Sequence, residues 1–174
     1  MTKMKAIYTA EATAKGGRNG HVKSNNDILD LQVRAPKALG GTSDDYANPE
    51  MLFAAGYSAC FDSALNLVIK KGKIKTGETS VNAKISIGQI EKGGFGLAAE
   101  LAVNIPEVSL EQAQDLVEQA HQVCPYSNAT RGNIEVKLSV TNEAKLSVTN
   151  EVENALSSAS DSFKEGVNKI NSLF

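Results

Sequence analysis

The fold is decided by the stretch Asn48-Pro49-Glu50-Met51-Leu52-Phe53-Ala54-Ala55-Gly56-Tyr57-Ser58-Ala59-Cys60-Phe61. It predicts a helix start, because Asn48 is a favoured N-cap, Pro49 suits the first helical position and Glu50 complements the helix dipole. The apolar character continues to Ile69, and Gly72 is expected to end the helix. Since this helix is apolar nearly all round, we expect it to be buried at the centre of the protein.

The segments on either side of this helix predict strands and one further helix. Alternating or extended patterns predict strands over residues 3–10, 29–33, 81–87, 97–105 and 134–140, with a glycine-rich hairpin turn at 91–96. A capping box, Ser109-Leu110-Glu111-Gln112, predicts a second helix that reaches Val123. This order of elements indicates an α+β fold. One curved sheet covers one side of a buried helix, so we expect a second subunit to cover the other.

Composition excludes several classes of function. The chain has 174 residues and a net charge of −2, which argues against a nucleic-acid or anionic-membrane partner. We find no 18-residue apolar stretch and no apolar region after the basic N-terminus, so we expect neither a transmembrane helix nor a secretion signal, and a cytoplasmic location. Cys60, Cys124, His21 and His121 are enough ligands for one zinc ion, but they come from scattered segments, so no metal is expected.

The end of the chain carries an unusual duplication. Residues 137–144, KLSVTNEA, are followed at once by residues 145–152, KLSVTNEV. We therefore predict a main domain over residues 1–142 and a C-terminal extension over 143–174, with the copied strand segment and an amphipathic helix. Its apolar stripe is expected to pack on the protein's own dimer, or alternatively to bind a partner. The stripe consists of Val152, Leu156, Ala159, Phe163, Val167, Ile170 and Leu173.

The chain contains two cysteines, in contrasting surroundings. Cys60 lies in the apolar helix, where water is scarce, whereas Cys124 opens the turn-rich stretch Cys124-Pro125-Tyr126-Ser127-Asn128-Ala129-Thr130-Arg131-Gly132-Asn133, where the backbone is expected to move. A protected attacking thiolate and a mobile resolving thiol are what a two-cysteine redox enzyme needs. A free buried cysteine is more often an inert part of the core, so the pair alone does not establish this function.

A cation is needed if a buried thiol is to ionise near neutral pH. Arg18, on a glycine-rich turn, is a candidate, and Glu50 could grip its guanidinium bidentately. Taken singly, Arg18 is also explained as a solvated turn residue and Glu50 as a partner of the helix dipole. Arg131, near the second cysteine, is a rival cation.

The two long motifs, residues 48–61 and 123–133, resemble those of the organic hydroperoxide resistance (Ohr) proteins of the OsmC-like superfamily. The resemblance covers roughly residues 4–142. The continuation after Cys124-Pro125 favours this branch over the osmotically induced branch, which prefers hydrogen peroxide. The resemblance implies curved antiparallel sheets wrapped around long central helices in an intertwined homodimer, with two sites at the subunit interface.

The resemblance also implies a thiol peroxidase that reduces organic hydroperoxides to alcohols. In it, Cys60 would be the peroxidatic cysteine and Cys124 the resolving cysteine, with a Cys60–Cys124 disulfide recycled by a lipoylated protein or another dithiol. Arg18 would hold the thiolate and peroxide and lower the Cys60 pKa, and Glu50 would orient Arg18. No bound cofactor is implied. From the apolar residues near Cys60 we expect Phe53, Tyr57 and Phe61 to line the substrate pocket.

A second hypothesis remains open at this point. The same thiol pair could serve a non-catalytic redox sensor that reports peroxide to a partner through the C-terminal helix. A sensor is oxidised once, whereas an enzyme consumes many equivalents of peroxide.

Overall fold

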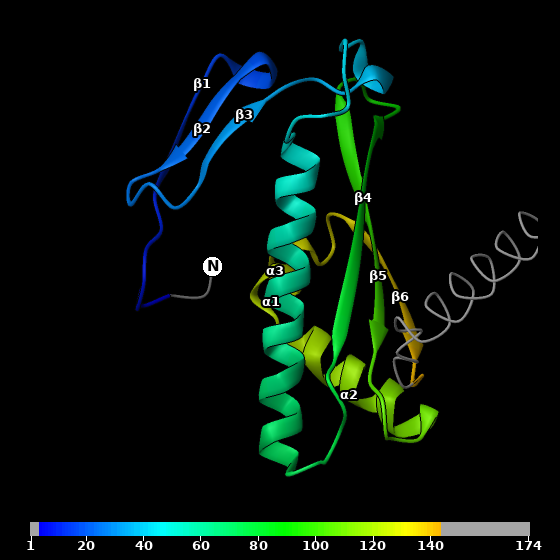
Figure 1. The fold of residues 1–174 in the computed structure, drawn as a ribbon. Helices are drawn as coiled ribbons and strands as arrows, with labels where there is room; N and C mark the ends of the chain where they lie inside the picture. Colours follow the sequence, from blue (N-terminus) through cyan, green and yellow to red (C-terminus); the bar gives the residue numbers. More distant parts are fainter. Residues whose placement is uncertain (1–3, 144–174) are drawn as a thin grey trace, which may run out of the picture.

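The computed structural model describes residues 4–143, and Figure 1 shows their arrangement. The described chain contains helices and two three-stranded sheets, so the predicted α+β class is confirmed. The elements are β1 (Ala12–Lys15), the 3-10 turn η1 (Gly17–Asn19), β2 (Gly20–Ser24), β3 (Asp30–Val33), η2 (Lys37–Leu39), α1 (Pro49–Gly72), β4 (Ser80–Gln89), β5 (Phe95–Asn104), α2 (Leu110–Val123), α3 (Pro125–Thr130) and β6 (Glu135–Thr141).

The first sheet is an antiparallel arm of three short strands in the order β1-β2-β3. Its register aligns Ala14, Val22 and Leu31 across one face and Lys15, His21 and Gln32 across the other, so one face is apolar and one polar. The predicted strand over residues 3–10 is wrong in its placement. Its described part pairs with no other strand, and the first strand begins at Ala12.

Helix α1 begins as predicted and ends one residue later than predicted. The Asn48 side chain accepts a hydrogen bond of 2.8 Å from the Met51 amide, which caps the first turn. Gly72 is still helical, and Lys73 ends the helix in the left-handed conformation with φ of 53°. The amide of Lys73 bonds back to Ile69 and Lys70 carbonyls, which satisfies groups that the helix end leaves free.

The second sheet has the order β4-β5-β6 and is mixed. β4 and β5 form the expected antiparallel hairpin, but β6 runs parallel to β5. The expectation of purely antiparallel sheets is therefore wrong for this pair. The physical reason is the connection, because α2 and α3 carry the chain back to the starting end of β5 before β6 begins.

The core lies where α1 packs against β4 and α2 (Figure 1). Its largest fully buried side chains include Tyr57, Phe61 and Leu65 from α1, Leu101 from β5 and Leu116 from α2. By length and composition α1 is apolar enough to cross a membrane, contrary to our expectation. One face of α1 is buried in this core, through residues that include Tyr57, Phe61 and Leu65, so we interpret it as the core helix of the domain.

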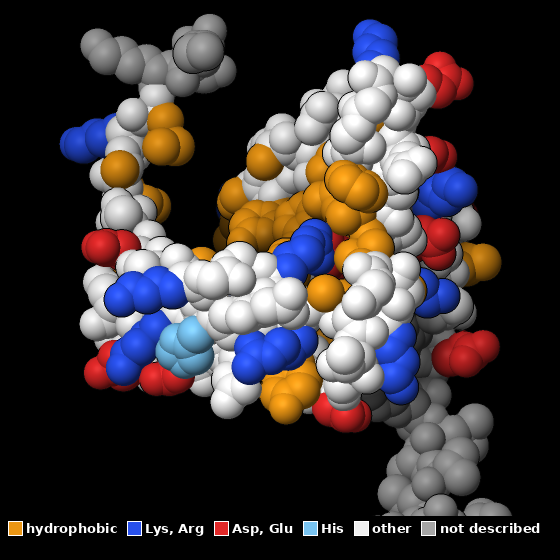
Figure 2. Space-filling model, turned by 90° about the horizontal axis from the view of Figure 1, so that it is seen from above, with side chains coloured by type: hydrophobic (Ala, Val, Ile, Leu, Met, Phe, Trp, Pro, Cys, Tyr) orange, Lys and Arg blue, Asp and Glu red, His pale blue; other side chains and the backbone are white. Residues whose placement is uncertain are grey.

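One side of α1 is not covered by the described chain. Met51, Ala55, Ala59 and Leu67 are exposed along it. Figure 2 shows a hollow between the arm sheet and the rest of the molecule, with hydrophobic side chains on its inner walls. This is the uncovered side that the sequence predicted. The predicted C-terminal extension over residues 143–174 lies, apart from residue 143, outside the described residues, so the domain boundary at 142 stays a prediction.

Candidate active site

The two cysteines, 64 positions apart in the sequence, meet in the fold. The Sγ atoms of Cys124 and Cys60 lie 3.7 Å apart, and both thiols are free. Cys60 projects from the middle of α1, and Cys124 stands between α2 and α3. A disulfide requires the sulfurs to approach to about 2.05 Å, so a small movement of either thiol would join them.

The surroundings of the two thiols are the reverse of our expectation. Cys124 is fully buried, and its amide donates a 2.8 Å hydrogen bond to the Ala120 carbonyl. The stretch that we expected to be a mobile loop forms α3, and Cys124 is its N-cap residue. Cys60 is only partly buried. The accessible thiol is therefore Cys60, which is the one that a peroxide must reach.

Burial raises the pKa of the Cys60 thiol and is the largest effect on it. The backbone of Tyr126 lowers this pKa, and the neighbouring Cys124 raises it. Arg18 is not among the groups that shift it. Within one chain, then, Arg18 does not lower the Cys60 pKa, and its expected role toward the thiolate stays a prediction. The reason is distance along the helix. Arg18 is held at Glu50, which precedes Cys60 by ten residues, or about 15 Å of helix rise.

Arg18 and Glu50 form the bidentate pair that we predicted. The Arg18 Nη1 and Nη2 atoms donate to the two Glu50 carboxylate oxygens over 2.8 Å and 2.6 Å. Arg18 lies in η1 just after Gly16 and Gly17, which both have positive φ, and Glu50 lies in the first turn of α1. The guanidinium holds the pKa of the Glu50 carboxyl below its usual value. The carboxylate is thus charged and fixes the direction of the arginine.

A cavity of about 300 Å³ opens beside this ion pair. Of the three residues predicted to line a substrate pocket, only Phe53 lines it. Tyr57 and Phe61 are fully buried in the core, so we do not assign them to the pocket wall. The cavity is lined by Arg18, Pro49, Glu50, Phe53, Ile87, Phe95, Gly96 and Leu97.

The sequence did not identify three of the residues that line the cavity, Ile87, Phe95 and Leu97. The sequence placed Ile87 and Leu97 at the ends of predicted strands and Phe95 in the predicted hairpin turn, whereas in the structure all three lie in β4 and β5. Phe95 is exposed in the single chain, but exposure is known only from the structure, so the sequence carried no signal for this position. The pairing of β4 with β5 brings these three residues beside the first turn of α1.

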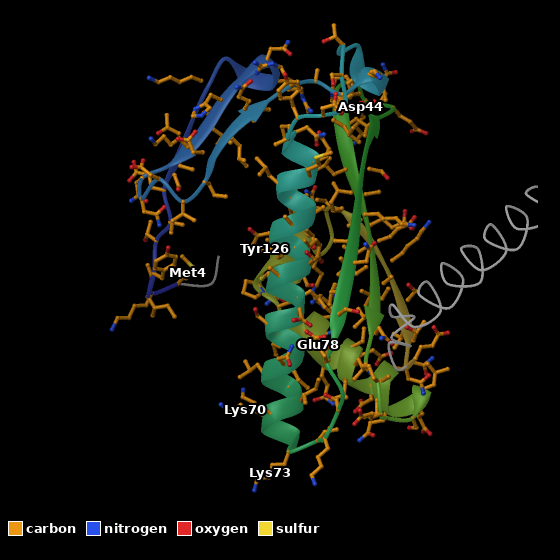
Figure 3. All side chains as sticks on the ribbon, viewed as in Figure 1. Met4, Asp44, Lys70, Lys73, Glu78 and Tyr126 are labelled. Atoms are coloured by element: carbon orange, nitrogen blue, oxygen red, sulfur yellow. The ribbon has the colours of Figure 1, made fainter. Side chains whose placement is uncertain are left out.

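Tyr126 is a further residue of the site that the sequence analysis did not single out. Its ring stacks against Phe53, with centroids 6.0 Å apart, and tilts against Tyr57 at 5.8 Å. Figure 3 marks it beside the middle of α1. A Cβ atom on Gly56 would lie only 2.9 Å from its hydroxyl oxygen, so glycine is needed there for this close approach. Tyr126 therefore lies between the thiols and the side chain that lines the cavity.

The other residues considered as a cation or as zinc ligands make contacts outside this site. Arg131, the rival cation, donates to the Gln122 side chain and the His121 carbonyl, each over 2.8 Å, and so ties α3 to the end of α2. His21 is on the polar face of the arm sheet, where its Nε2 lies 2.5 Å from Asp30 Oδ1. Within residues 4–143, no group of three or more His, Cys, Asp or Glu side chains is placed to hold a metal ion.

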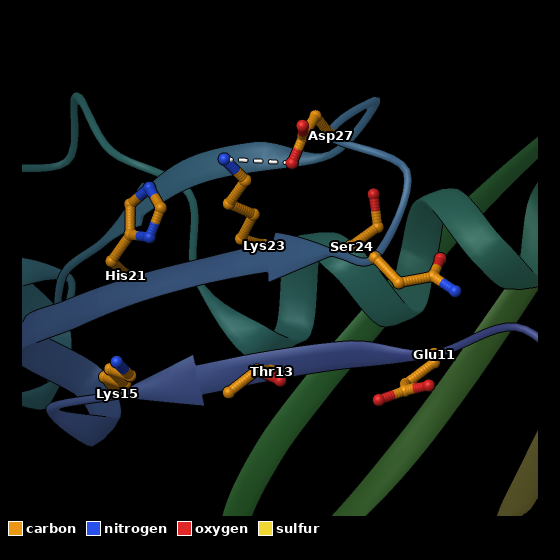
Figure 4. Close-up of a pocket in the computed structure, with 8 residues that line it drawn as sticks. Glu11, Thr13, Lys15, His21, Lys23, Ser24 and Asp27 are labelled. Carbon is orange, nitrogen blue, oxygen red and sulfur yellow. Dashed lines mark ion pairs between the residues drawn. The ribbon is translucent and has the colours of Figure 1, made fainter.

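A second hollow lies on that polar face, over β1 and β2 (Figure 4). It contains Lys15, His21 and Lys23 as basic side chains and Glu11 and Asp27 as acidic ones. Lys23 pairs with Asp27 over 2.9 Å, so much of the charge is already compensated. No cysteine lines this hollow, and we do not include it in the site.

Comparison with known proteins agrees with this geometry. The family model described as OsmC-like protein matches residues 41–139. The organic hydroperoxide resistance protein of Xanthomonas axonopodis pv. citri is 50% identical over 137 residues, which cover 78% of this chain and 96% of that protein. The chain belongs to the organic hydroperoxide resistance branch of the OsmC-like family.

Solved structures of this family share the fold of the described chain. The organic hydroperoxide resistance protein from Elizabethkingia anophelis is 75% identical, with a TM-score of 0.78, and the match covers 80% of this chain and all of that one. The family member OhrB of Bacillus subtilis is 44% identical, with a TM-score of 0.71, and the match covers 78% of this chain and all of that one. The predicted OsmC-like fold is confirmed.

Proposed function

We propose that the protein is a cysteine-based peroxidase that reduces organic hydroperoxides to alcohols in the cytoplasm. The observation that carries the proposal is the 3.7 Å approach of Cys60 to Cys124, with Cys60 the more accessible thiol. The names of the relatives, which concern resistance to organic hydroperoxides, support the same substrate class.

The chemistry follows from the two thiols. The Cys60 thiolate attacks the distal oxygen of the peroxide, the O–O bond breaks, and an alcohol leaves while Cys60 becomes a sulfenic acid. Cys124 then attacks the Cys60 sulfur, and water leaves as the disulfide forms. A dithiol of the lipoyl type attacks this disulfide, is oxidised itself and returns both cysteines to thiols.

The cavity beside Arg18 and Glu50 supports organic rather than inorganic peroxides as substrates. Apolar side chains of Phe53, Ile87 and Phe95 form its walls, which suits an alkyl or aryl group. We expect a higher kcat/KM for cumene hydroperoxide than for hydrogen peroxide. Equal values would contradict this part of the proposal.

We further propose that the working unit is a homodimer, because the exposed side of α1 and the apolar face of the arm sheet need a cover. Ala55 and Ala59 are small and exposed, so a second α1 can approach closely. An antiparallel pairing of two α1 helices centred on Ala55 would set Glu50 of one subunit opposite Cys60 of the other. The Arg18–Glu50 pair would then supply the cation that Cys60 lacks within its own chain.

The test of the chemistry is turnover of cumene hydroperoxide with dihydrolipoamide, wild type beside Cys60→Ser. We expect many equivalents consumed by wild type and none by the variant. A single stoichiometric oxidation would instead support the redox sensor. The helix through which a sensor would signal lies outside the described residues, so we propose the enzyme.

The test of the dimer is complementation between two inactive variants. Arg18→Ala and Cys60→Ser are expected to be inactive alone. Mixed dimers of the two regain one intact site if Arg18 acts across the interface. If Arg18 served the cysteine of its own chain, no mixed dimer would contain an intact site and activity would stay absent.

A further inference from the structure

We infer that the Tyr126 hydroxyl is the general acid that protonates the departing alkoxide when Cys60 reduces an organic hydroperoxide. The inference rests on the proposed function and assigns one more catalytic residue to it. It is carried by the position of Tyr126, whose hydroxyl lies against Gly56, one helical turn before Cys60, and whose ring contacts Phe53 in the wall of the cavity.

The geometry places the hydroxyl close to the reacting thiol. Gly56 precedes Cys60 by four residues, so the two positions are neighbours on one face of α1, with about 5–6 Å between Cβ positions. The Tyr126 hydroxyl lies 2.9 Å from where a Gly56 Cβ would be. The peroxide oxygen that leaves with the organic group is one bond further from sulfur than the oxygen that is attacked. It can therefore come within hydrogen-bond reach of this hydroxyl.

The hydroxyl is also available. The hydroxyl of Tyr57, its neighbour, is buried and bonded to Ser127 Oγ over 3.0 Å and to Thr130 over 3.3 Å. The Tyr126 hydroxyl has no hydrogen-bond partner among the described residues, and the side chain is 38% exposed. The Tyr57 hydroxyl thus holds α1 to α3, whereas the Tyr126 hydroxyl lies against Gly56, one turn of α1 before Cys60, and is not used by another bond within the described chain.

The chemistry suits a phenol. Thiolate attack joins sulfur to the distal oxygen, which keeps its hydrogen, and breaks the O–O bond, so the electron pair of that bond leaves on the alkoxide. Tyr126 gives its proton to the alkoxide, the alcohol departs, and the phenolate regains a proton from water. A phenol protonates an alkoxide easily, because a phenol is a far stronger acid than an alcohol, which is about as weak an acid as water. In the proposed dimer the partner subunit's Arg18 can stabilise the charge, but an arginine does not give up a proton near neutral pH.

A leaving group that needs no proton separates this role from a structural one. A peracid releases a carboxylate, whose conjugate acid has a pKa of roughly 4, as Asp and Glu do. Cumene hydroperoxide and perbenzoic acid both carry a phenyl ring, so they make a matched pair. The measurement is the rate constant for oxidation of Cys60 in a single turnover, which is independent of the dithiol.

We expect Tyr126→Phe to slow oxidation by cumene hydroperoxide by about 100-fold, the lower range for a general acid, and to leave oxidation by perbenzoic acid nearly unchanged. Gly56→Ala should produce the same selective loss, because its Cβ displaces the Tyr126 ring while the hydroxyl remains in the chain. Tyr57→Phe removes a structural hydroxyl and should affect the two oxidants equally.

Equal loss with both oxidants in Tyr126→Phe, or no loss with either, would overturn the assignment. Failure of the proposed function would look different, since wild type itself would then not be oxidised at Cys60 by cumene hydroperoxide.

Discussion

At the residue scale, the Arg18–Glu50 pair contributes to the stability of the fold in a pH-dependent way. Because Arg18 lowers the folded-state pKa of Glu50, the pair stabilises the fold above the unfolded-state pKa of about 4.3, and this contribution is lost as pH falls through the lowered folded value. We predict that Glu50→Gln reduces the free energy of unfolding by about 1 kcal/mol at pH 7, given the exposure of Arg18. Urea unfolding of both proteins from pH 7 to pH 3 measures this.

The difference between wild type and Glu50→Gln should shrink toward pH 3. A difference that stays constant across this range would show that the effect comes from something other than the charge of Glu50.

Cys124 also acts on its partner thiol. Burial is the largest cause of the raised Cys60 pKa, and Cys124 adds to it. We predict that Cys124→Ala moves the pH profile of Cys60 alkylation toward lower pH, because one group that disfavours the thiolate is removed. Alkylation rates measured from pH 5 to pH 10 provide the test, with Cys60→Ser as the unreactive control. A shift toward higher pH would contradict the assignment of Cys124 as a group that disfavours ionisation.

At the scale of elements, the end of α1 carries backbone strain at a lysine. Lys73 occupies the left-handed region with φ of 53°, a conformation that glycine adopts without a steric cost. We predict that Lys73→Gly raises the free energy of unfolding by about 0.5–1 kcal/mol, measured by thermal and urea unfolding. Lys71→Gly is the matched control, since Lys71 is helical and glycine there should destabilise the helix by up to about 1 kcal/mol.

If both glycine variants destabilised the protein, the left-handed conformation of Lys73 would not be a source of strain at the end of α1. The position of Gly72 accounts for the wrong prediction of the helix end. A glycine near a helix end is the usual signal, but Gly72 continues the helix and the following lysine turns the chain.

At the scale of the whole molecule, the predicted extension over residues 143–174 can be tested by truncation. The match to the Elizabethkingia structure covers all of that chain but 80% of this one. We predict that a truncation after Asn142 keeps the kcat/KM of the full chain for cumene hydroperoxide, since every proposed site residue precedes it. If the apolar stripe of residues 152–173 packs on the dimer, the truncated protein should have a lower Tm.

Analytical ultracentrifugation and thermal unfolding of the two forms provide the measurements. Unchanged assembly together with an unchanged Tm would reject both packing on the dimer and a role in higher assembly.

Much about this protein was determined by the sequence alone. The N-cap Asn48, the capping box at Ser109 and the alternating strands predicted their elements, because caps and periodicity act between residues close in the chain. The bidentate pair of Arg18 and Glu50 was also predicted, through the resemblance to a known family.

Only the tertiary structure decided which thiol is buried, which way β6 runs and which residues line the cavity. Cys124 looked mobile because its stretch is rich in turn-forming residues, yet packing against α1 folds that stretch into α3. The β4–β5 hairpin brings Phe95 and Leu97 to the cavity. Tyr126 approaches α1 closely because Gly56 has no side chain. These contacts join residues far apart in the sequence, so no local pattern contains them.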